Sequence, residues 1–437
     1  MRVAYLAAGA AGMYCGSCLR DHRLAAALIA KGRDVVLIPL YTPLRTEEPY
    51  IGRRRVLYGG INVYLQQKSS LFRHTPRIVD TLFDSPMLLR GAGSFATGTK
   101  PGLLGSLTVS VLKGEDGFQR KELDKLLDVL REIQPDLVHL PNLMFVGIAG
   151  AIKQALGVSV LCTLSGEDVF LDQLPAPYRE QAFGLIRDRS RDVDAFVAVT
   201  CYFADRAADH FSLPPDRTHV IPMGINVDGF DRSGDGPDGP FIIGYLARIC
   251  PQKGLAQLAE AFLHLRREGR DCRLHVAGYL EDRAYLHEVR QSIERAGATD
   301  HFRWRGEVSR SEKIEFLQSL HMLSVPAVYP EAKGLYLLEA LAAGVPVVQP
   351  RRGSFPEIIQ ATSGGLLYDP EENTALAAAI ARLMDDPVLR ARLGRDGQRA
   401  VRSSFTDDLM AERTWSLYER LCPANDREVG DCQEDVP

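Results

Sequence analysis

Short, mostly apolar runs alternate with longer amphipathic segments along most of the chain. Gly, Pro, Asp or Asn bounds most of these runs, which is typical of strands separated by turns. In the first half of the chain the expected strands cover 2–7, 34–40, 137–140, 159–164, 195–199 and 219–221, and the first helix covers 18–31. Because the runs are apolar throughout rather than alternating, they predict a parallel sheet that helices cover on both faces.

The same alternation restarts after 228–240, a segment rich in Gly, Asp and Pro that we expect to be a linker. Beyond it, strands are expected at 241–245, 273–277, 302–305, 323–325 and 346–349, and helices at 254–268, 283–295, 309–318, 335–343 and 374–384. Ser309 is expected to cap the third of these helices, with Glu312 completing a capping box.

The pattern therefore predicts an α/β protein with two Rossmann-like, parallel-sheet domains that face a central cleft. We expect the first domain to cover 1–227 and the second to cover 241–406. A helix over 407–422 is predicted to cross back to the first domain. The polar tail over 423–437 is predicted to be disordered.

Length and composition agree with this organisation. A chain of 437 residues is too long for one ordinary core, and 46% apolar with 25% charged residues is the balance of a soluble globular protein. The formal net charge of −4 makes a nucleic-acid partner unexpected. No apolar run approaches the ~20 residues of a membrane span, so we expect a cytoplasmic protein.

The segment 41–117 fits no clear strand–helix unit and carries several basic residues, namely Arg53, Arg54, Arg55, Arg73, His74 and Arg77. One interpretation is an irregular insertion with a solvated basic face. The other is a surface that binds the acceptor or contacts the inner face of a membrane.

The most specific motif is PEAKGLYLLEALAAGVPVV, at 330–348. A helix that opens near Gly334 and Leu335, directly after a buried strand, presents free N–H groups that suit an anion. Glu331 precedes that helix and can accept hydrogen bonds from sugar hydroxyls, while Glu339 on the helix can bind a ribose. The alternative is an ordinary amphipathic helix with one exposed Glu and one loop Glu.

The second motif is GYLARICPQKG, at 244–254, in which Arg248 and Lys253 follow another expected strand. Two cations at the carboxyl end of a strand can bind a diphosphate and stabilise it as a leaving group. The alternative is a pair of surface cations. Because ligands of open α/β sheets bind at the carboxyl ends of strands, we expect the two motifs to form one site.

The R-x4-K and E-x7-E pair resembles family 4 of the retaining glycosyltransferases, the glycogen-synthase and mannosyltransferase-like group with the GT-B fold. The resemblance extends to IPMGINVDGF at 221–230, GSFPEII at 353–359 and GGLLYDP at 364–370. It implies that Arg248 and Lys253 hold the donor diphosphate, that Glu331 faces the donor sugar, and that Glu339 binds the ribose. It also implies a metal-independent reaction with retention, without a bound cofactor, and it places Glu357 near the cleft.

Two positions depart from the family pattern. Lys333 stands where members often have an aromatic residue, and Ser165 in TLSGEDVF (163–170) stands where many have a histidine that contacts the sugar. Ser165 can hydrogen-bond a hydroxyl or phosphate, or it can simply cap the next helix. Glu167 and Asp168 are candidates for binding acceptor hydroxyls. For Glu167 we favour an ordinary acid of the first helical turn.

The glycine-rich first turn, AAGAAGMYCGSC at 7–18, lacks the G-x-G-x-x-G order of a dinucleotide site. By resemblance it faces the cleft, so Gly12 joins the expected donor-binding residues. Cys15 and Cys18 form a C-x-x-C that we interpret as two packed thiols rather than a redox motif.

Two further sets of polar residues are given structural interpretations. Asp192 and Asp194 form a D-x-D at the amino end of a strand, which favours a surface turn over a metal site. His139, His275 and His321 are expected to be hydrogen-bonded core histidines.

The sequence therefore predicts a transferase that moves a sugar from a nucleoside diphosphate sugar to a sugar, lipid or small-molecule acceptor. A nucleotide-sugar epimerase or a phosphorylase on the same fold is the enzymatic alternative. A non-catalytic sugar-nucleotide sensor is the alternative outside enzymes.

Overall fold

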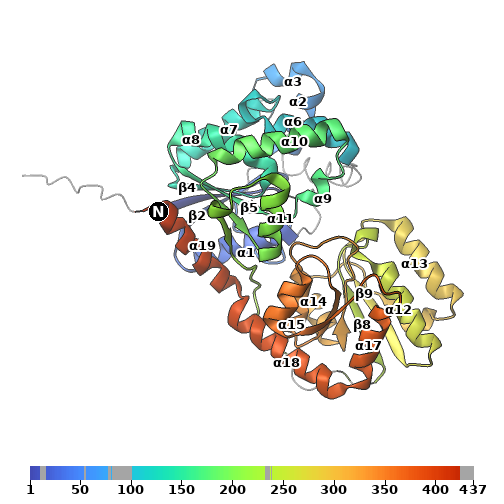
Figure 1. The fold of residues 1–437 in the computed structure, drawn as a ribbon. Helices are drawn as coiled ribbons and strands as arrows, with labels where there is room; N and C mark the ends of the chain where they lie inside the picture. Colours follow the sequence, from blue (N-terminus) through green and yellow to red (C-terminus); the bar gives the residue numbers. More distant parts are fainter. Residues whose placement is uncertain are drawn as a thin grey trace, which may run out of the picture.

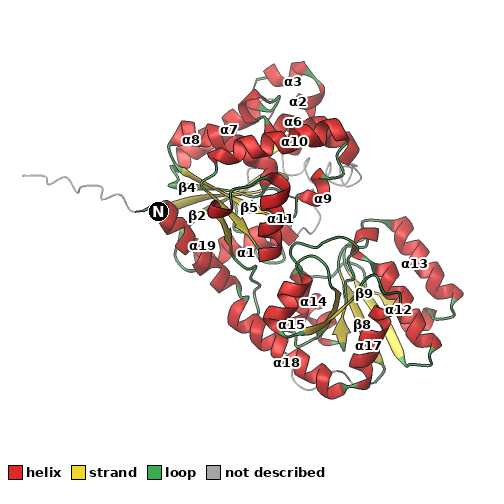
Figure 2. Cartoon of the chain, viewed as in Figure 1, coloured by secondary structure: helices red, strands yellow, loops and turns green. Residues whose placement is uncertain are grey.

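The computed structural model describes residues 1–9, 16–53, 56–76, 80, 101–231, 237 and 239–423. These residues form two parallel sheets with helices packed around each, and the prediction of two Rossmann-like domains is confirmed (Figures 1 and 2). Among the described residues, no helix combines the length and the apolar character that crossing a bilayer requires.

The first sheet has seven strands, and its central strand is wholly buried. The strands lie in the order β3 (Leu57–Gly59), β2 (Asp34–Tyr41), β1 (Arg2–Ala7), β4 (Leu137–Leu140), β5 (Ser159–Leu164), β6 (Ala195–Ala198) and β7 (Thr218–Val220). In β1, Val3 pairs with Val35 on one side and with Leu137 on the other. From β1 the chain adds β2 and β3 on one side of the sheet, and from β4 onward it adds strands on the other side. The loops after β1 and β4 therefore lie next to each other at the carboxyl edge of the sheet.

Nine α-helices of the described chain belong to this first domain. They are α1 (Gly16–Ala30), α2 (Gly60–Lys68), α3 (Ser70–His74), α6 (Pro101–Leu112), α7 (Arg120–Ile133), α8 (Ala149–Leu156), α9 (Asp168–Leu171), α10 (Ala176–Arg189) and α11 (Cys201–Phe211). The segment 41–117 therefore contains a strand and several helices, which its sequence pattern did not predict. β3 is only three residues long, too short for a recognisable apolar run.

The basic residues of this segment are partly accounted for. The Arg73 guanidinium lies 3.4 Å from the centroid of the Phe118 ring, and its Nε donates to the Gln66 carbonyl at 2.8 Å. Arg54, Arg55 and Arg77 lie outside the described residues. Contact of this segment with an acceptor or a membrane stays a prediction.

The second sheet has six strands, in the order β10 (Phe302–Trp304), β9 (Cys272–Ala277), β8 (Phe241–Leu246), β11 (Met322–Leu323), β12 (Val347–Pro350) and β13 (Gly365–Tyr368). Around it lie α12 (Leu255–Arg267), α13 (Arg283–Arg295), α14 (Arg310–Gln318), α15 (Leu335–Ala342), α16 (Phe355–Thr362), α17 (Ala375–Asp385) and α18 (Pro387–Ser404). The capping box at Ser309 and Glu312 is confirmed. The strand order switches between β8 and β11, which are neighbours, so the loops after them lie side by side.

The chain passes between the domains twice, and the two crossings are hydrogen-bonded to each other. Ile225 N–H donates to the Phe405 carbonyl at 2.9 Å, and Asp407 N–H donates to the Ile225 carbonyl at 3.1 Å. A Cβ at Gly224 would lie 2.1 Å from the Thr406 carbonyl oxygen, so only glycine permits this approach. The paired crossings make a compact connection between the two sheets.

The last helix, α19 (Asp407–Leu421), runs from the second domain to the first and packs along α1 (Figure 1). Lys31, directly after α1, forms an ion pair with Glu412 at 2.9 Å. The Tyr418 hydroxyl lies 2.6 Å from His139 Nδ1, inside the first domain. The predicted tail, from residue 424 onward, and residues 232–236 and 238 of the predicted linker lie outside the described residues.

The three core histidines differ in their hydrogen bonding. His139 lies between Tyr418 and the Thr163 hydroxyl, and His321 Nδ1 accepts from the Ile242 N–H at 3.0 Å. Within the described chain His275 Nδ1 has no hydrogen-bond partner, so the prediction of a hydrogen-bonded core histidine is wrong for that nitrogen. Burial, together with nearby arginines, lowers the pKa of His275 to about 4, which keeps the ring neutral at pH 7.

Candidate active site at the domain interface

Lys253 and Glu331 meet where the loops after β8 and β11 lie side by side. The Lys253 ammonium donates to Glu331 Oε2 and to the Tyr329 hydroxyl, the latter at 2.7 Å, and Tyr329 donates to the same carboxylate oxygen at 2.9 Å. The ammonium also lies 5.1 Å and 5.4 Å from the ring centroids of Tyr329 and Tyr336. The two residues expected to hold a diphosphate and to face a sugar are thus in direct contact.

The Glu331 carboxylate is ionised although it is buried. Burial raises its pKa, but the Lys253 ammonium and the hydrogen bonds from Lys253 and Tyr329 outweigh burial and lower the pKa to about 2. Lys253 and Glu331 are a buried cation and anion with hydroxyl groups around both. A charged ligand can therefore replace one member of the pair as the partner of the other. An incoming phosphate would bind Lys253 and leave Glu331 free to accept hydrogen bonds.

Helix α15 begins beside this pair. Gly334 has φ +66°, and a Cβ there would lie 2.6 Å from a Leu337 methyl group, so glycine is required at the turn into the helix. Within the described part of the chain, no side chain caps the helix that starts at Leu335. Its first N–H groups therefore lie next to Glu331 as donors for an anion.

Glu339 lies one turn further along α15, in a four-residue cluster that crosses the domain interface. Lys313 and Glu339 come from the second domain, and Arg23 and Glu47 come from the first. Lys313 Nζ lies 2.7 Å from Glu339 Oε1 and from Glu47 Oε1, while Arg23 Nη2 lies 2.8 Å from Glu47 and 3.3 Å from Glu339. All four side chains are buried. Burial raises the pKa of Glu339, but Lys313 and Arg23 lower it overall.

Arg248 follows β8 as predicted, but it forms an ion pair with an acid outside the expected site. Its Nη1 pairs with Glu281 Oε2 at 2.5 Å, and its side chain is 41% exposed. The structure therefore joins Lys253 to Glu331 directly, places Glu339 in the interface cluster, and pairs Arg248 with a surface acid.

The first domain contributes Ser165, at the carboxyl end of β5. The Ser165 carbonyl accepts from Lys333 Nζ at 2.7 Å, and its hydroxyl donates to the Pro141 carbonyl at 3.4 Å. Gly12 and Cys15 lie outside the described residues, and Cys18 is buried. Ser165 thus lies across the interface from the loop that carries Glu331.

The two acids after Ser165 have partners within the first domain. Glu167 accepts from the Ser165 N–H at 2.9 Å with both carboxylate oxygens, and from the Leu143 N–H at 3.4 Å. Glu167 therefore links the end of β5 to the loop after β4, and it is not an ordinary acid of the first helical turn. Asp168 pairs with Arg206 at 2.5 Å.

Sequence patterns did not reveal Arg23, Glu47 or Lys313. The sequence of α1 did contain a signal. Four consecutive polar residues, Arg20 to Arg23, interrupt a helix whose later residues are mostly apolar, and all four are buried. Arg20 and Asp21 form an ion pair beneath the site, together with the Tyr5 hydroxyl. Buried charge on a helix facing the carboxyl ends of strands indicates a functional or interface role.

Glu357 also joins the two domains. From α16 of the second domain, its carboxylate oxygens accept the N–H groups of Cys201 and Tyr202, both at 2.9 Å, at the start of α11 in the first domain. The acid therefore caps a helix of the other domain, where the positive end of the helix dipole favours it.

Replacing Glu357 by Ala is expected to destabilise the chain by about 1–2 kcal/mol, because it removes this cap. Burial and the Glu357 charge both raise the pKa of Cys201, so the variant should also alkylate faster at that thiol. Urea unfolding and the iodoacetamide labelling rate of the Cys201 peptide measure the two effects. Glu357→Gln, which keeps an acceptor but loses the charge, should accelerate labelling with a smaller loss of stability. Unchanged labelling in both variants would contradict the assignment.

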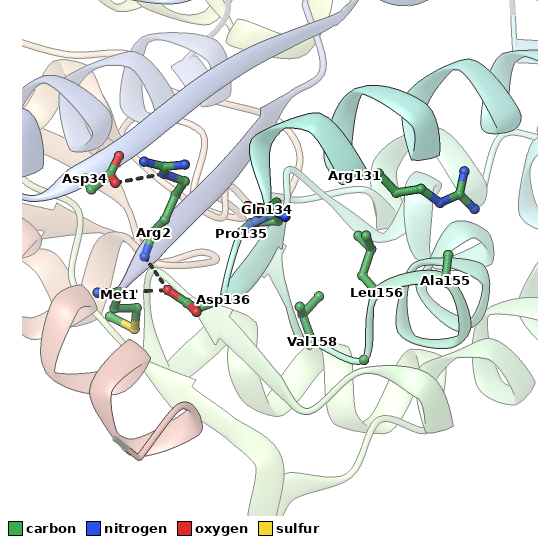
Figure 3. A pocket seen from close by; sticks show the side chains of 11 residues that line it. Met1, Arg2, Asp34, Arg131, Gln134, Pro135, Asp136, Ala155, Leu156 and Val158 are labelled. Carbon is green, nitrogen blue, oxygen red and sulfur yellow. Dashed lines mark hydrogen bonds and ion pairs between the residues drawn. The ribbon is translucent and has the colours of Figure 1, made fainter. Parts of the chain in front are cut away.

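Two further features of the first domain, among the residues that the structure describes, have structural explanations. Asp194 pairs with Lys153 at 2.6 Å and accepts the Val160 N–H at 2.8 Å, so it is already engaged in fixing a turn. A surface hollow of about 870 Å³ lies at the amino ends of the strands, as Figure 3 shows. Several of its charged groups are already engaged: the Arg2 side chain pairs with Asp34, and Asp136 accepts the Arg2 backbone N–H at 2.6 Å.

Comparison with known proteins places the chain in a family. A family model described as glycosyltransferase family 4 matches residues 111–228, and one described as glycosyl transferases group 1 matches residues 229–400. The two matches adjoin at the domain junction.

Curated relatives are mainly sugar transferases. An MMP α-(1→4)-mannosyltransferase of Mycolicibacterium hassiacum is 28% identical over 53% of this chain and 55% of its own length, so the chain spans only about half of that relative. An α-maltose-1-phosphate synthase of Mycolicibacterium smegmatis is 25% identical over 84% of this chain and 96% of its own.

Solved structures share the fold at low sequence identity. Sucrose-phosphate synthase from Thermosynechococcus elongatus superposes with a TM-score of 0.70 at 18% identity, covering 96% of this chain and 99% of that one. HepE from Anabaena, solved in complex with UDP-glucose, superposes with a TM-score of 0.66 at 15% identity, covering 96% and 100%. The chain therefore contains a glycosyltransferase family 4 domain followed by a glycosyl transferases group 1 domain, and its two sheets form the GT-B fold.

Proposed function

We propose that this chain transfers a hexose from a nucleoside diphosphate sugar to an acceptor hydroxyl, with retention of the anomeric configuration and without a metal ion. The observation that carries the proposal is the contact between Lys253 and Glu331 beside the uncapped start of α15. It supplies a buried cation, free N–H donors and a sugar-binding carboxylate within one loop cluster. Arg248, from the same loop as Lys253, would add a second cation to the diphosphate.

In the reaction proposed, the bond between the anomeric carbon and the diphosphate oxygen breaks while the acceptor oxygen bonds to the same face of that carbon. The acceptor proton passes to the departing phosphate. Lys253 and the α15 N–H groups stabilise the negative charge that develops on the diphosphate. Glu331 and Glu339 hold the sugar and the ribose, and Ser165 approaches from the first domain.

The contacts between the domains also favour this chemistry. Ala332 and Lys333, on the same loop as Glu331, bond to Thr200 and Ser165 of the first domain. A closed interface of this kind excludes water, which would otherwise hydrolyse the donor. The similar proteins include a mannosyltransferase, a maltose-1-phosphate synthase and a sucrose-phosphate synthase, which supports a hexose donor and leaves the acceptor open.

A thermal-shift screen of UDP-glucose, ADP-glucose and GDP-mannose against the full chain tests donor binding. A true donor raises the melting temperature increasingly as its concentration exceeds the dissociation constant. The product anomeric configuration by NMR, with a panel of sugar acceptors, then tests retention. Donor conversion without acceptor would indicate an epimerase, and a strict requirement for inorganic phosphate would indicate a phosphorylase. Binding without any turnover would indicate a sensor, and an inverted product would refute retention.

A further inference from the structure

Lys333 extends from the second domain into the first. It belongs to the loop between Glu331 and α15, and its Nζ donates to Ser17 Oγ at 2.6 Å and to the Ser165 carbonyl at 2.7 Å. Ser17 lies in the first turn of α1, and Ser165 directly follows β5. The ammonium therefore lies where the start of α1, the end of β5 and the Glu331 loop come together.

The position of this ammonium is fixed by its neighbour in the loop. Ala332 is only 4% exposed and packs in the core of the first domain, and its carbonyl accepts from the Thr200 hydroxyl at 3.2 Å. Because the backbone beside Lys333 is anchored in the first domain, the side chain has little freedom to reach elsewhere. The anchored backbone at Ala332 therefore holds the Lys333 ammonium between the two domains.

The charge of Lys333 lacks a close counter-charge. Both of its hydrogen-bond partners are uncharged oxygens, and among the described residues no carboxylate lies within 4.0 Å of Nζ. The nearby acids are engaged by other groups, Glu331 by Lys253 and Glu167 by backbone N–H groups. An ammonium has three donors, and the described residues accept from two of them, through Ser17 and Ser165.

We propose that Lys333 determines specificity by binding an anionic substituent, a carboxylate or a phosphate, on one of the two reacting sugars. This inference rests on the proposed function and deepens it. The donor diphosphate has its own cation in Lys253, on the other side of Glu331. Lys333 faces the first domain instead. In the proposed function, an acceptor or the far end of the donor sugar would bind on that side. A half-buried ammonium that forms no ion pair with the described residues favours an anion over a neutral hydroxyl.

The anion has two possible sources, which the substrates distinguish. One arm compares UDP-glucuronate with UDP-glucose as donor, or the matching pair on whichever nucleotide the thermal-shift screen selects. The other arm compares glucose 1-phosphate and glucose 6-phosphate with glucose as acceptor. In one arm we expect the wild-type chain to show at least about a tenfold higher kcat/KM for the charged substrate, which is the effect of a single charged hydrogen bond.

Lys333→Met should abolish that preference while the kcat/KM for the neutral substrate changes much less. Lys333→Arg, which keeps the charge, should retain most of the preference. Lys153→Met is the matched control, since it removes an ion-paired lysine at the other end of the sheet. The melting temperature of each variant verifies that it is folded, so that a lost preference is not a lost fold.

The outcomes separate the two levels of the proposal. Turnover without a preference for the charged substrate in either arm overturns the role of Lys333 alone, and so does a preference that persists in Lys333→Met. A wild-type chain that turns over no nucleotide sugar overturns the proposed function, and the inference with it.

Discussion

Replacing Lys253 by Met is expected to lower kcat for sugar transfer about a hundred- to a thousandfold. The ammonium stabilises charge that develops on the diphosphate only as the glycosidic bond breaks, and removal of one such donor typically has an effect of this size on kcat. The KM for the donor should change less, because α15 and the remaining site groups still bind the ground state. Steady-state kinetics with the identified donor measures both.

The same substitution has a structural cost that must be separated from the catalytic one. Without Lys253, the Glu331 carboxylate stays buried and loses its counter-charge, which typically destabilises a protein by about 3–5 kcal/mol. The double variant Lys253→Met with Glu331→Gln removes both charges and should recover most of that stability. It should remain inactive. A double variant that recovers activity together with stability would show that the pair is structural and not catalytic.

The acid dependence of stability supplies a further check on this pair. Glu331 has a pKa of about 2 in the folded chain and about 4.3 when unfolded, so its ionised form stabilises the fold above pH 4.3. That contribution is lost as the pH falls from about 4.3 to 2. The double variant lacks the titrating group and should lose less stability across this range in urea titrations.

How well the sequence predicts each feature depends on how far apart in the chain the interacting residues lie. Strands such as Arg2–Ala7 and Leu137–Leu140 are buried because their own residues are mostly apolar, and this local signal is why their bounds match the prediction. The capping box at Ser309 likewise depends on residues three positions apart. β3, in contrast, is a strand only because it pairs with β2, and three residues do not reveal that.

The candidate site divides in the same way. The loops with Lys253 and Glu331 follow neighbouring strands, so their meeting could be inferred from the alternation of strands and helices. The partners of Glu339 could not, since Arg23 lies 316 residues away in the other domain. Their encounter depends on how the two domains face each other, and no local pattern encodes that. Lys333 was visible as a departure from the family pattern, but its contact with Ser165 was not.

Removing the Glu339 carboxylate is expected to weaken binding of the nucleotide sugar about ten- to a hundredfold. In the proposed function this carboxylate accepts the ribose hydroxyls, and hydrogen bonds to a charged group contribute about 1.5–3 kcal/mol. Glu339→Gln is the informative variant, and isothermal titration with the identified donor and with its free nucleoside diphosphate measures the loss. Both ligands carry the ribose, so both should lose affinity by the same factor.

Glu47→Gln provides the matched control for this prediction. Glu47 pairs with the same two cations, Arg23 and Lys313, and is as well buried, but it belongs to the first domain. Both substitutions leave two cations with a single acid, so both should weaken the domain interface and lower the melting temperature to a similar degree. Only Glu339→Gln also deletes a ligand of the ribose. An equal loss of nucleotide affinity in the two variants would mean that the cluster acts through domain closure, and that the ribose is bound elsewhere.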